Sequence, residues 1–158
     1  MCLGIAISWT ELPLELIAQH GLERRAHQRG GEKGEREVQF LFRDRDPRLP
    51  VWRDGQLQIA RWGNTRGISR FLPRTGWTWQ ETIDSGAWKN TDAVPVDIPA
   101  TLGFEKGVWY RIRQGIRGLI VSDEHGDPVV YMICEPSTHY YRIMTRSDRM
   151  PVLIDERI

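Results

Sequence analysis

The sequence is poor in cysteine and in long apolar runs, and each shortage excludes a class of protein. Among its 158 residues, Cys2 and Cys134 are the only cysteines, too few for a disulfide framework or for a structural zinc site of their own. No apolar run reaches the roughly 20 residues of a membrane-spanning helix. No basic segment leads into an apolar one at the amino end, as in a secretory signal. We therefore expect a soluble, cytoplasmic protein with no membrane partner.

Sequence motifs for phosphate, dinucleotide and metal binding are also missing. The chain has no glycine-rich loop followed by Lys-Ser or Lys-Thr, and no Gly-x-Gly-x-x-Gly fingerprint. Its four histidines are far apart and show no metal-ligand spacing. We expect neither a metal nor a cofactor.

Lysine is scarce, although basic residues are not. Only three of the 22 basic residues are lysines, and the net charge is +1. The planar guanidinium of arginine suits phosphate and stacks on bases, so this composition, together with seven tryptophans, suits a groove for single-stranded nucleic acid. A GC-rich coding sequence would produce the same bias, and the composition leaves both explanations open.

The composition otherwise predicts one globular domain over residues 1–158, and we expect a monomer. Hydrophobic residues make up 40% of the chain and charged residues 27%. Residues 11–22 and 80–88 have the pattern of short helices. The polar, glycine-rich stretch over residues 27–37 predicts a flexible surface loop.

Short strands dominate the remainder. Residues 51–60 predict a hairpin around the Asp54-Gly55 turn, and the prolines of segment 94–99 favour an edge strand there. Because the strands follow one another in hairpins, the expected fold class is α+β, mainly antiparallel β with few short helices. The other predicted strands cover residues 38–42, 108–112, 118–121, 129–134, 140–144 and 152–154.

Cys2 directly follows the initiator Met1. Removal of Met1 would leave a thiol and a free α-amine on neighbouring carbons. The amine can capture an aldehyde as a Schiff base, and the thiol can then close on the same carbon to give a thiazolidine. Many proteins carry a second-position cysteine with no such role, so the feature alone does not establish this chemistry.

Four segments, in order along most of the chain, together resemble the SOS response-associated peptidase (SRAP) family. The closest is Ser147 to Val152, against the family's His-Asp-Arg-Met-Pro-Val. The first departs after Cys2, where the family usually continues with Gly-Arg. The segments are Met1-Cys2; Pro50-Val51-Trp52-Arg53-Asp54-Gly55 with Arg61-Trp62-Gly63; Glu81-Thr82-Ile83 with Ile98-Pro99-Ala100 and Gly103-Phe104-Glu105; and Ser147-Asp148-Arg149-Met150-Pro151-Val152.

The resemblance implies a compact fold of barrel-like β-sheets with a positively charged cleft. It implies binding of single-stranded DNA and covalent capture of abasic sites by Cys2 after Met1 has been removed. The open form of an abasic sugar is an aldehyde, so the implied activity agrees with the aminothiol chemistry above. The family is also described as an autocatalytic peptidase.

By resemblance, Cys2 is the nucleophile and Glu105 the general acid/base. Arg149 would contact the DNA backbone, since a guanidinium suits bidentate phosphate binding. Trp62 would stack on a base or fill the core. The alternatives are an ordinary exposed carboxylate at Glu105 and a salt bridge between Arg149 and Asp148 or another acid.

Two supporting positions of the family are lost or moved. The family's catalytic histidine falls on Ser147, whose hydroxyl cannot carry protons near neutral pH as imidazole does. The family's Asn-x-Arg falls on Trp77-Thr78-Trp79, whereas Asn64-Thr65-Arg66 has the same spacing earlier in the chain. Asn64 and Arg66 could bind DNA there, or they could be a turn-forming residue and a surface arginine.

Three functions remain open at this stage, and whether the chain is an enzyme is one of the open points. The first is a single-stranded DNA binder that captures abasic sites through Cys2. The second is a catalytically weakened SRAP-like module that binds DNA or protein. The third is a cysteine-dependent, self-processing peptidase.

Overall fold

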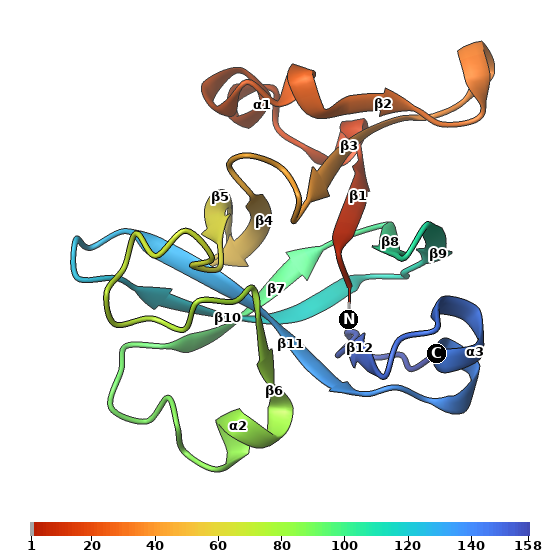
Figure 1. Ribbon diagram of the computed structural model, residues 1–158. Helices are drawn as coiled ribbons and strands as arrows, with labels where there is room; N and C mark the ends of the chain where they lie inside the picture. Colours follow the sequence, from red (N-terminus) through yellow and green to blue (C-terminus); the bar gives the residue numbers. More distant parts are fainter. Residues whose placement is uncertain (1) are drawn as a thin grey trace.

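The computed structural model describes residues 2–158, apart from the side chain of Lys33. Two β-sheets contain most of the regular secondary structure of the described residues, and the α-helices are short (Figure 1). The helices are α1 (Leu14–His20), α2 (Gln80–Asp84) and α3 (His139–Thr145). The predicted α+β class, rich in β-structure with few short helices, is confirmed.

The first sheet has five antiparallel strands in the order β2-β3-β1-β8-β9. Its central strand, β1, begins two residues after Cys2, and Gly4 pairs with Leu41 on one side and with Phe104 on the other. The amino-terminal segment is therefore held between two neighbours. The strands are β1 (Gly4–Ser8), β2 (Ala26–Gln28), β3 (Arg36–Leu41), β8 (Leu102–Glu105) and β9 (Val108–Arg111).

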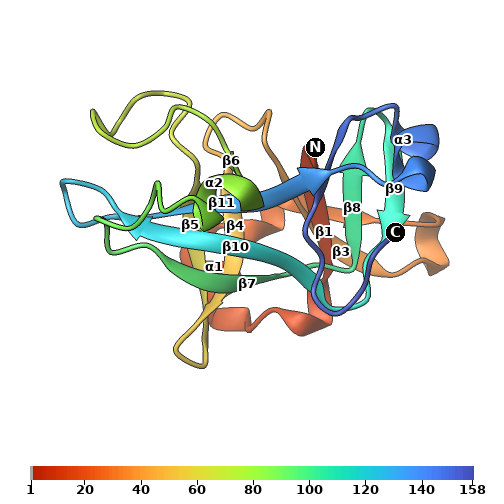
Figure 2. The same ribbon diagram turned by 90° about the horizontal axis from the view of Figure 1, so that it is seen from below.

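The second sheet closes on itself. Its order is β10-β7-β4-β5-β11-β12, and a further pairing of β10 with β11 joins five of its strands into a barrel (Figure 2). Strand β11 pairs in parallel with β5 and β6, and the other pairs are antiparallel. The strands are β4 (Arg48–Arg53), β5 (Gln56–Trp62), β6 (Trp77–Trp79), β7 (Val94–Pro99), β10 (Gly115–Ser122), β11 (Pro128–Pro136) and β12 (Arg149–Pro151).

One apolar core joins the two sheets. It contains Ile5 and Phe40 of the first sheet together with Trp62, Ile98 and Ile116 of the barrel, all fully buried. Burial of side chains of this size contributes roughly 1.5–3 kcal/mol each to stability. Side chains of both sheets therefore pack in one core, and the start of β1 lies near β12 (Figure 1).

The hairpin predicted over residues 51–60 is confirmed by β4 and β5. Asp54 and Gly55 both have positive φ, 52° and 75°, as a two-residue type I′ turn requires. The helix predicted over 11–22 is shorter than expected: α1 ends where Gly21 adopts φ 60°, and 3₁₀ turns flank it. The helix predicted over 80–88 corresponds to α2, which ends four residues earlier, at Asp84.

Other predicted elements were wrong. Residues 140–144 lie in helix α3, not in a strand, because Thr138 caps the helix by accepting a hydrogen bond from the Tyr141 amide. Strand β7 is not an edge strand, since it pairs with β10 on one side and with β4 on the other. The strand expected at 152–154 lies three residues earlier, as β12.

The segment 27–37, predicted to be a surface loop, is the tip of a hairpin. Its first residues belong to β2 and its last two to β3, with a 3₁₀ turn, Gly31–Lys33, between them. His27 pairs with Glu37 across this hairpin.

Candidate functional site

Backbone hydrogen bonds hold the segment around Cys2 from both sides. The Leu3 amide donates to the Phe104 carbonyl at 2.7 Å, and the Phe42 amide donates to the Leu3 carbonyl at 3.0 Å. The Trp77 indole Nε1 donates to the carbonyl of Cys2 at 3.0 Å. Cys2 is therefore an ordered residue with 0% of its surface exposed.

The Cys2 thiol faces the protein interior. Its Sγ donates a hydrogen bond to the Gly4 carbonyl at 2.9 Å. Burial raises the pKa of the thiol, and a hydrogen bond with the Tyr110 hydroxyl acts in the opposite direction. In the intact chain the sulfur is therefore a protonated, inward-facing thiol at neutral pH.

Glu105 is the last residue of β8, directly before the turn to β9. Lys106 and Gly107 form this turn with φ 46° and 82°. Only 1% of the Glu105 surface is exposed. Burial raises the pKa of its carboxyl, and positive groups that include Lys106 and Arg149 partly offset this. Glu105 therefore keeps its proton to a higher pH than an ordinary glutamate.

A long-range hydrogen bond joins the β8–β9 turn to the end of α3. The Lys106 Nζ donates to the Arg146 carbonyl at 2.7 Å, where Arg146 ends the helix with φ 59°. This contact brings the segment after α3, including Ser147, to the side of the molecule where Glu105 lies. Ser147 is buried, and its Oγ donates to the Arg149 carbonyl at 3.0 Å.

Arg149 begins strand β12 and is half-buried. Its guanidinium lies 5.2 Å from the centre of the Trp79 ring, within the range of a cation–π interaction. Its charge also lowers the pKa of Glu105 and of the buried Cys134, although burial raises both overall. The position predicted to contact DNA thus carries a cation that acts on the candidate acid.

The structure therefore brings together four predicted residues that are distant in sequence: Cys2, Glu105, Ser147 and Arg149. They lie where the ends of β1 and β8 meet β12 and α3, near the amino terminus in Figure 1. Glu105 raises the pKa of the Cys2 thiol, and Arg149 lowers the pKa of Glu105, as expected for neighbouring groups. Met1, whose removal the aminothiol chemistry requires, lies outside the described residues.

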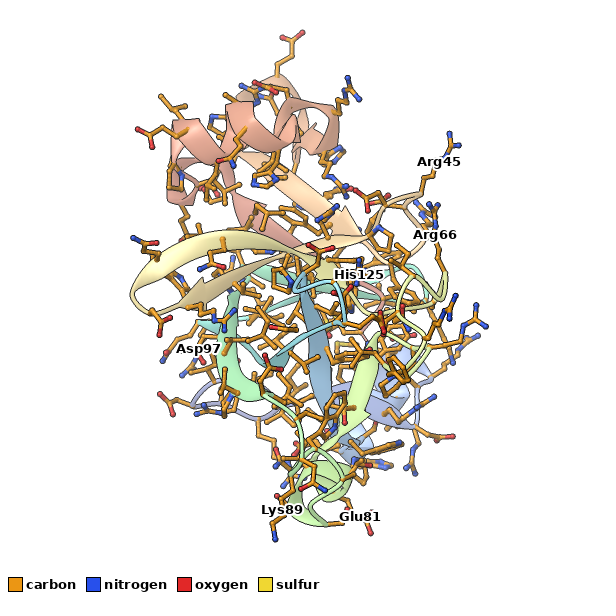
Figure 3. The ribbon with its side chains drawn as sticks, turned by 90° about the vertical axis from the view of Figure 1, so that its left-hand side faces the viewer. Arg45, Arg66, Glu81, Lys89, Asp97 and His125 are labelled. Atoms are coloured by element: carbon orange, nitrogen blue, oxygen red, sulfur yellow. The ribbon has the colours of Figure 1, made fainter. Side chains whose placement is uncertain are left out.

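The other predicted DNA-binding residues have different environments. Trp62 is 0% exposed, packs edge-to-face with Phe42 at 5.0 Å, and donates from Nε1 to the Gly76 carbonyl at 3.0 Å. Its ring therefore has no free face for a nucleobase, which corrects the expectation of stacking and leaves the alternative, a core residue. Arg66 is exposed and projects from the surface (Figure 3).

Asn64 has a structural role in the loop that follows β5. Its Nδ2 donates to the carbonyls of Ser69 and Leu72 at 3.0 and 2.9 Å, and its Oδ1 accepts from the Ser69 amide. The side chain is buried, so its polar atoms are used within the loop and not by a ligand. This corrects the expectation that Asn64 contacts DNA and supports the turn-forming alternative.

Sequence reasoning missed three aromatic residues beside Cys2, namely Trp77, Tyr110 and Tyr141. The Tyr110 and Tyr141 hydroxyls lie 3.1 Å apart, and both residues are buried. Trp77-Thr78-Trp79 departs from the family pattern, yet the Trp77 indole donates a hydrogen bond to the Cys2 carbonyl. No periodicity in the sequence would have indicated these long-range contacts.

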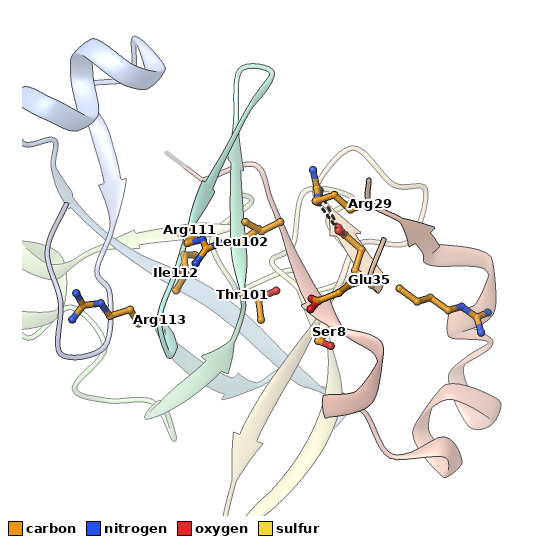
Figure 4. A pocket seen from close by; sticks show the side chains of 10 residues that line it. Ser8, Arg29, Glu35, Thr101, Leu102, Arg111, Ile112 and Arg113 are labelled. Carbon is orange, nitrogen blue, oxygen red and sulfur yellow. Dashed lines mark hydrogen bonds and ion pairs between the residues drawn. The ribbon is translucent and has the colours of Figure 1, made fainter. Parts of the chain in front are cut away.

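A cavity of about 520 Å³ lies at the other end of β1, by Ser8 (Figure 4). Arg29 and Arg111 line it from opposite edges of the five-stranded sheet. Glu37 neutralises Arg29 through two hydrogen bonds of 2.6 and 3.0 Å. Its lining is thus of mixed charge, and it is separate from the Cys2 region.

Comparisons with known proteins found no match to this chain. No family model matches the chain, and neither a curated protein nor a solved structure matches it. Within residues 2–158, no three His, Cys, Asp or Glu side chains are grouped so that they could hold a metal ion. Over the same residues, no helix has both the length and the apolar character needed to cross a bilayer.

Proposed function

We propose that the chain binds single-stranded DNA and captures abasic sites covalently through Cys2. The observation that supports this most is the burial of Cys2 and Glu105 at one junction of the fold, although they come from different parts of the sequence. A buried carboxyl with a raised pKa is suited to move protons near neutral pH. The resemblance of Ser147 to Val152 and of the amino terminus to the SRAP family points to the same chemistry.

The reaction starts from the chain without Met1. The Cys2 α-amine adds to the aldehyde carbon of the open abasic sugar, and Glu105 donates a proton as the resulting hydroxyl leaves as water. The Glu105 carboxylate then recovers a proton from the nitrogen, which leaves a neutral imine. The Cys2 sulfur then adds to the carbon of the imine, and its proton ends on the ring nitrogen. Aldehyde and aminothiol thus give a thiazolidine and one water molecule.

The DNA backbone would be bound by arginines. Arg149 lies beside Glu105, half-buried and already oriented by the Trp79 ring. Arg66 is exposed and can add a phosphate contact. Because Cys2 has no exposed surface in the intact chain, the proposal requires that loss of Met1 makes the Cys2 amine accessible.

A gel assay with a single-stranded oligonucleotide that contains one abasic site tests the proposal. We expect a covalent species with the native protein and with Cys134→Ala, and none with Cys2→Ala. Glu105→Gln should slow its formation by roughly 100-fold, as expected for loss of general acid–base catalysis. Intact-mass measurement shows whether Met1 has been removed. A wild-type protein without Met1 that forms no covalent species, or a Cys2→Ala variant that forms as much, contradicts the proposal.

The burial of the thiol favours a second candidate, a weakened module that binds single-stranded DNA without reacting. A protonated sulfur with no exposed surface is a poor nucleophile. Binding to plain and abasic strands with equal affinity, weakening as salt is added and giving no covalent species, would select this function.

A further inference from the structure

Two buried tyrosine hydroxyls lie behind the Cys2 thiol and have no part in the reaction above. The hydroxyls of Tyr110 and Tyr141 are 3.1 Å apart, and their rings meet edge-to-face at 5.3 Å and 85°. Tyr110 comes from β9 and Tyr141 from α3, so two distant segments supply the pair. Tyr110 also lies close enough to the thiol to lower its pKa.

Gly103 is what allows the Tyr110 ring to reach β1. Gly103 lies opposite Tyr110 in the β8–β9 ladder and opposite Ile5 in the β1–β8 ladder. A Cβ at this position would lie 2.5 Å from Cζ and 2.6 Å from the hydroxyl oxygen of Tyr110. The ring thus crosses β8 over a residue without a side chain, which carries its hydroxyl toward the start of the chain.

The chemistry of the three groups fixes the direction of their hydrogen bonds when the sulfur is ionised. A thiolate can only accept, so the Tyr110 hydroxyl must donate to it. The Tyr110 oxygen can then accept from the Tyr141 hydroxyl. Two donors in series, shielded from water, polarise one another and strengthen the bond to the sulfur.

We propose that Tyr110, supported by Tyr141, is a positioning residue that holds the Cys2 sulfur and stabilises its ionised form for attack. The inference rests on the proposed function only in taking Cys2 as the nucleophile. The groups that face the sulfur are Glu105 from β8, Tyr110 from β9 and Tyr141 from α3. Glu105 opposes the ionised sulfur when it is itself ionised, whereas Tyr110 favours it more than the backbone at Gly4 and Phe104 does.

Titration of the Cys2 thiol in the absence of DNA tests this inference. Protein labelled with ¹³C-cysteine is titrated, and the Cβ shift of Cys2, identified as the signal lost in Cys2→Ser, reports its pKa. Tyr110→Phe should lower the ionisation constant about tenfold, the equivalent of one hydrogen bond to a charged group. Tyr141→Phe should have a smaller effect of the same sign, and the double variant should match Tyr110→Phe, because Tyr141 acts through Tyr110.

Tyr131→Phe is the matched control. Tyr131 is also fully buried, and its hydroxyl donates to the Pro73 carbonyl at 2.8 Å in a separate apolar cluster. This variant loses a buried hydroxyl but should leave the Cys2 titration unchanged. Gly103→Ala keeps both hydroxyls, displaces the Tyr110 ring, and should raise the pKa of Cys2 as Tyr110→Phe does.

The inference is overturned if Tyr110→Phe titrates like the native protein, or if Tyr131→Phe shifts Cys2 equally. The inference is also overturned if adding Tyr141→Phe to Tyr110→Phe shifts the pKa of Cys2 as much as Tyr141→Phe does alone. Should Tyr110→Phe fail to fold, Tyr141→Phe and Gly103→Ala decide the question. If the variants show these titration shifts but the native protein captures no abasic DNA, the proposed function is refuted and the inference stands.

Discussion

Burial of the Glu105 carboxyl makes its ionisation unfavourable in the folded chain. Because its pKa is raised, the folded protein retains a proton that the unfolded chain releases once the pH exceeds about 4.3, the usual glutamate value. The free energy of unfolding therefore falls as the pH rises from that value toward the folded pKa. The group suited to acid–base chemistry is thus one that reduces stability at neutral pH.

Glu105→Gln should accordingly stabilise the protein at pH 7. Glutamine keeps the shape of the side chain but does not ionise, so the unfolding midpoint should exceed that of the native protein at pH 7 and approach it near pH 4. Thermal unfolding followed by circular dichroism measures both. Glu81→Gln, at an exposed position in α2, is the control and should show no such trend. The argument is contradicted if the midpoint of Glu105→Gln minus that of the native protein is smaller at pH 7 than at pH 4.

The sequence supplied only part of the candidate site at this scale. Cys2, Glu105 and Arg149 came from short motifs, and the fold brings them together. Tyr110 and Tyr141 could not be found in the same way, because their contact depends on Gly103 and on the path of α3. Trp62 lies in the segment Arg61-Trp62-Gly63, but a short motif does not indicate which way the ring faces.

Among the elements, α3 matters most for the site because it carries Tyr141. Its first turn depends on Thr138, whose Oγ1 accepts from the Tyr141 amide at 3.1 Å. Loss of such a cap costs typically about 1 kcal/mol. The capped residue is Tyr141 itself, so fraying of this turn would move the hydroxyl that meets Tyr110.

Thr138→Ala should therefore lower the free energy of unfolding by about 1 kcal/mol. Urea unfolding followed by tryptophan fluorescence measures this change. Ser137→Ala is a matched control, since among the described residues the buried Ser137 hydroxyl has no hydrogen-bond partner, and its loss should be neutral or slightly stabilising. Equal destabilisation by both substitutions would show that the Thr138 cap contributes nothing.

The same helix shows why some elements were predicted and others were not. The hairpin at Asp54-Gly55 is a local feature, since two residues fix both the turn and the register. Segment 140–144 contains Tyr140, Tyr141 and Ile143, residue types common in strands, but the Thr138 cap and the Lys106 contact at the other end favour a helix. In this segment the helix cap and the tertiary contact outweigh the strand propensity of the residues.

For the whole molecule, the sequence patterns did not predict that the second sheet closes into a barrel. Strand β11 pairs with β10 in a hairpin that the sequence predicts, but it also pairs in parallel with β5 and β6. Parallel pairs join segments distant along the chain, so no local signal marks them. Strand β1 was also missed, although it lies at the centre of its sheet and carries Cys2 to the junction.

The concentration of buried thiols and phenols in this closed fold has a consequence for stability in alkali. Burial raises the pKa of Cys2 and Cys134 and also that of Tyr110, Tyr131 and Tyr141. In the unfolded chain these groups ionise near their usual pKa values, about 8.5 for cysteine and 10 for tyrosine. Above about pH 8.5 the unfolded chain thus binds fewer protons than the folded one, and the free energy of unfolding falls as the pH rises.

Urea unfolding between pH 7 and pH 10.5, with a reductant present to keep the thiols free, should therefore show a midpoint that falls steeply above pH 8.5. Each proton that only the folded chain retains steepens the fall by up to about 1.4 kcal/mol per pH unit. Tyr131→Phe, which removes one such group outside the Cys2 region, should flatten the profile above pH 10 whatever its effect at pH 7. A midpoint that stays constant to pH 10.5 would mean that these side chains ionise in the folded protein as readily as in the unfolded chain, and that the junction around Cys2 admits water.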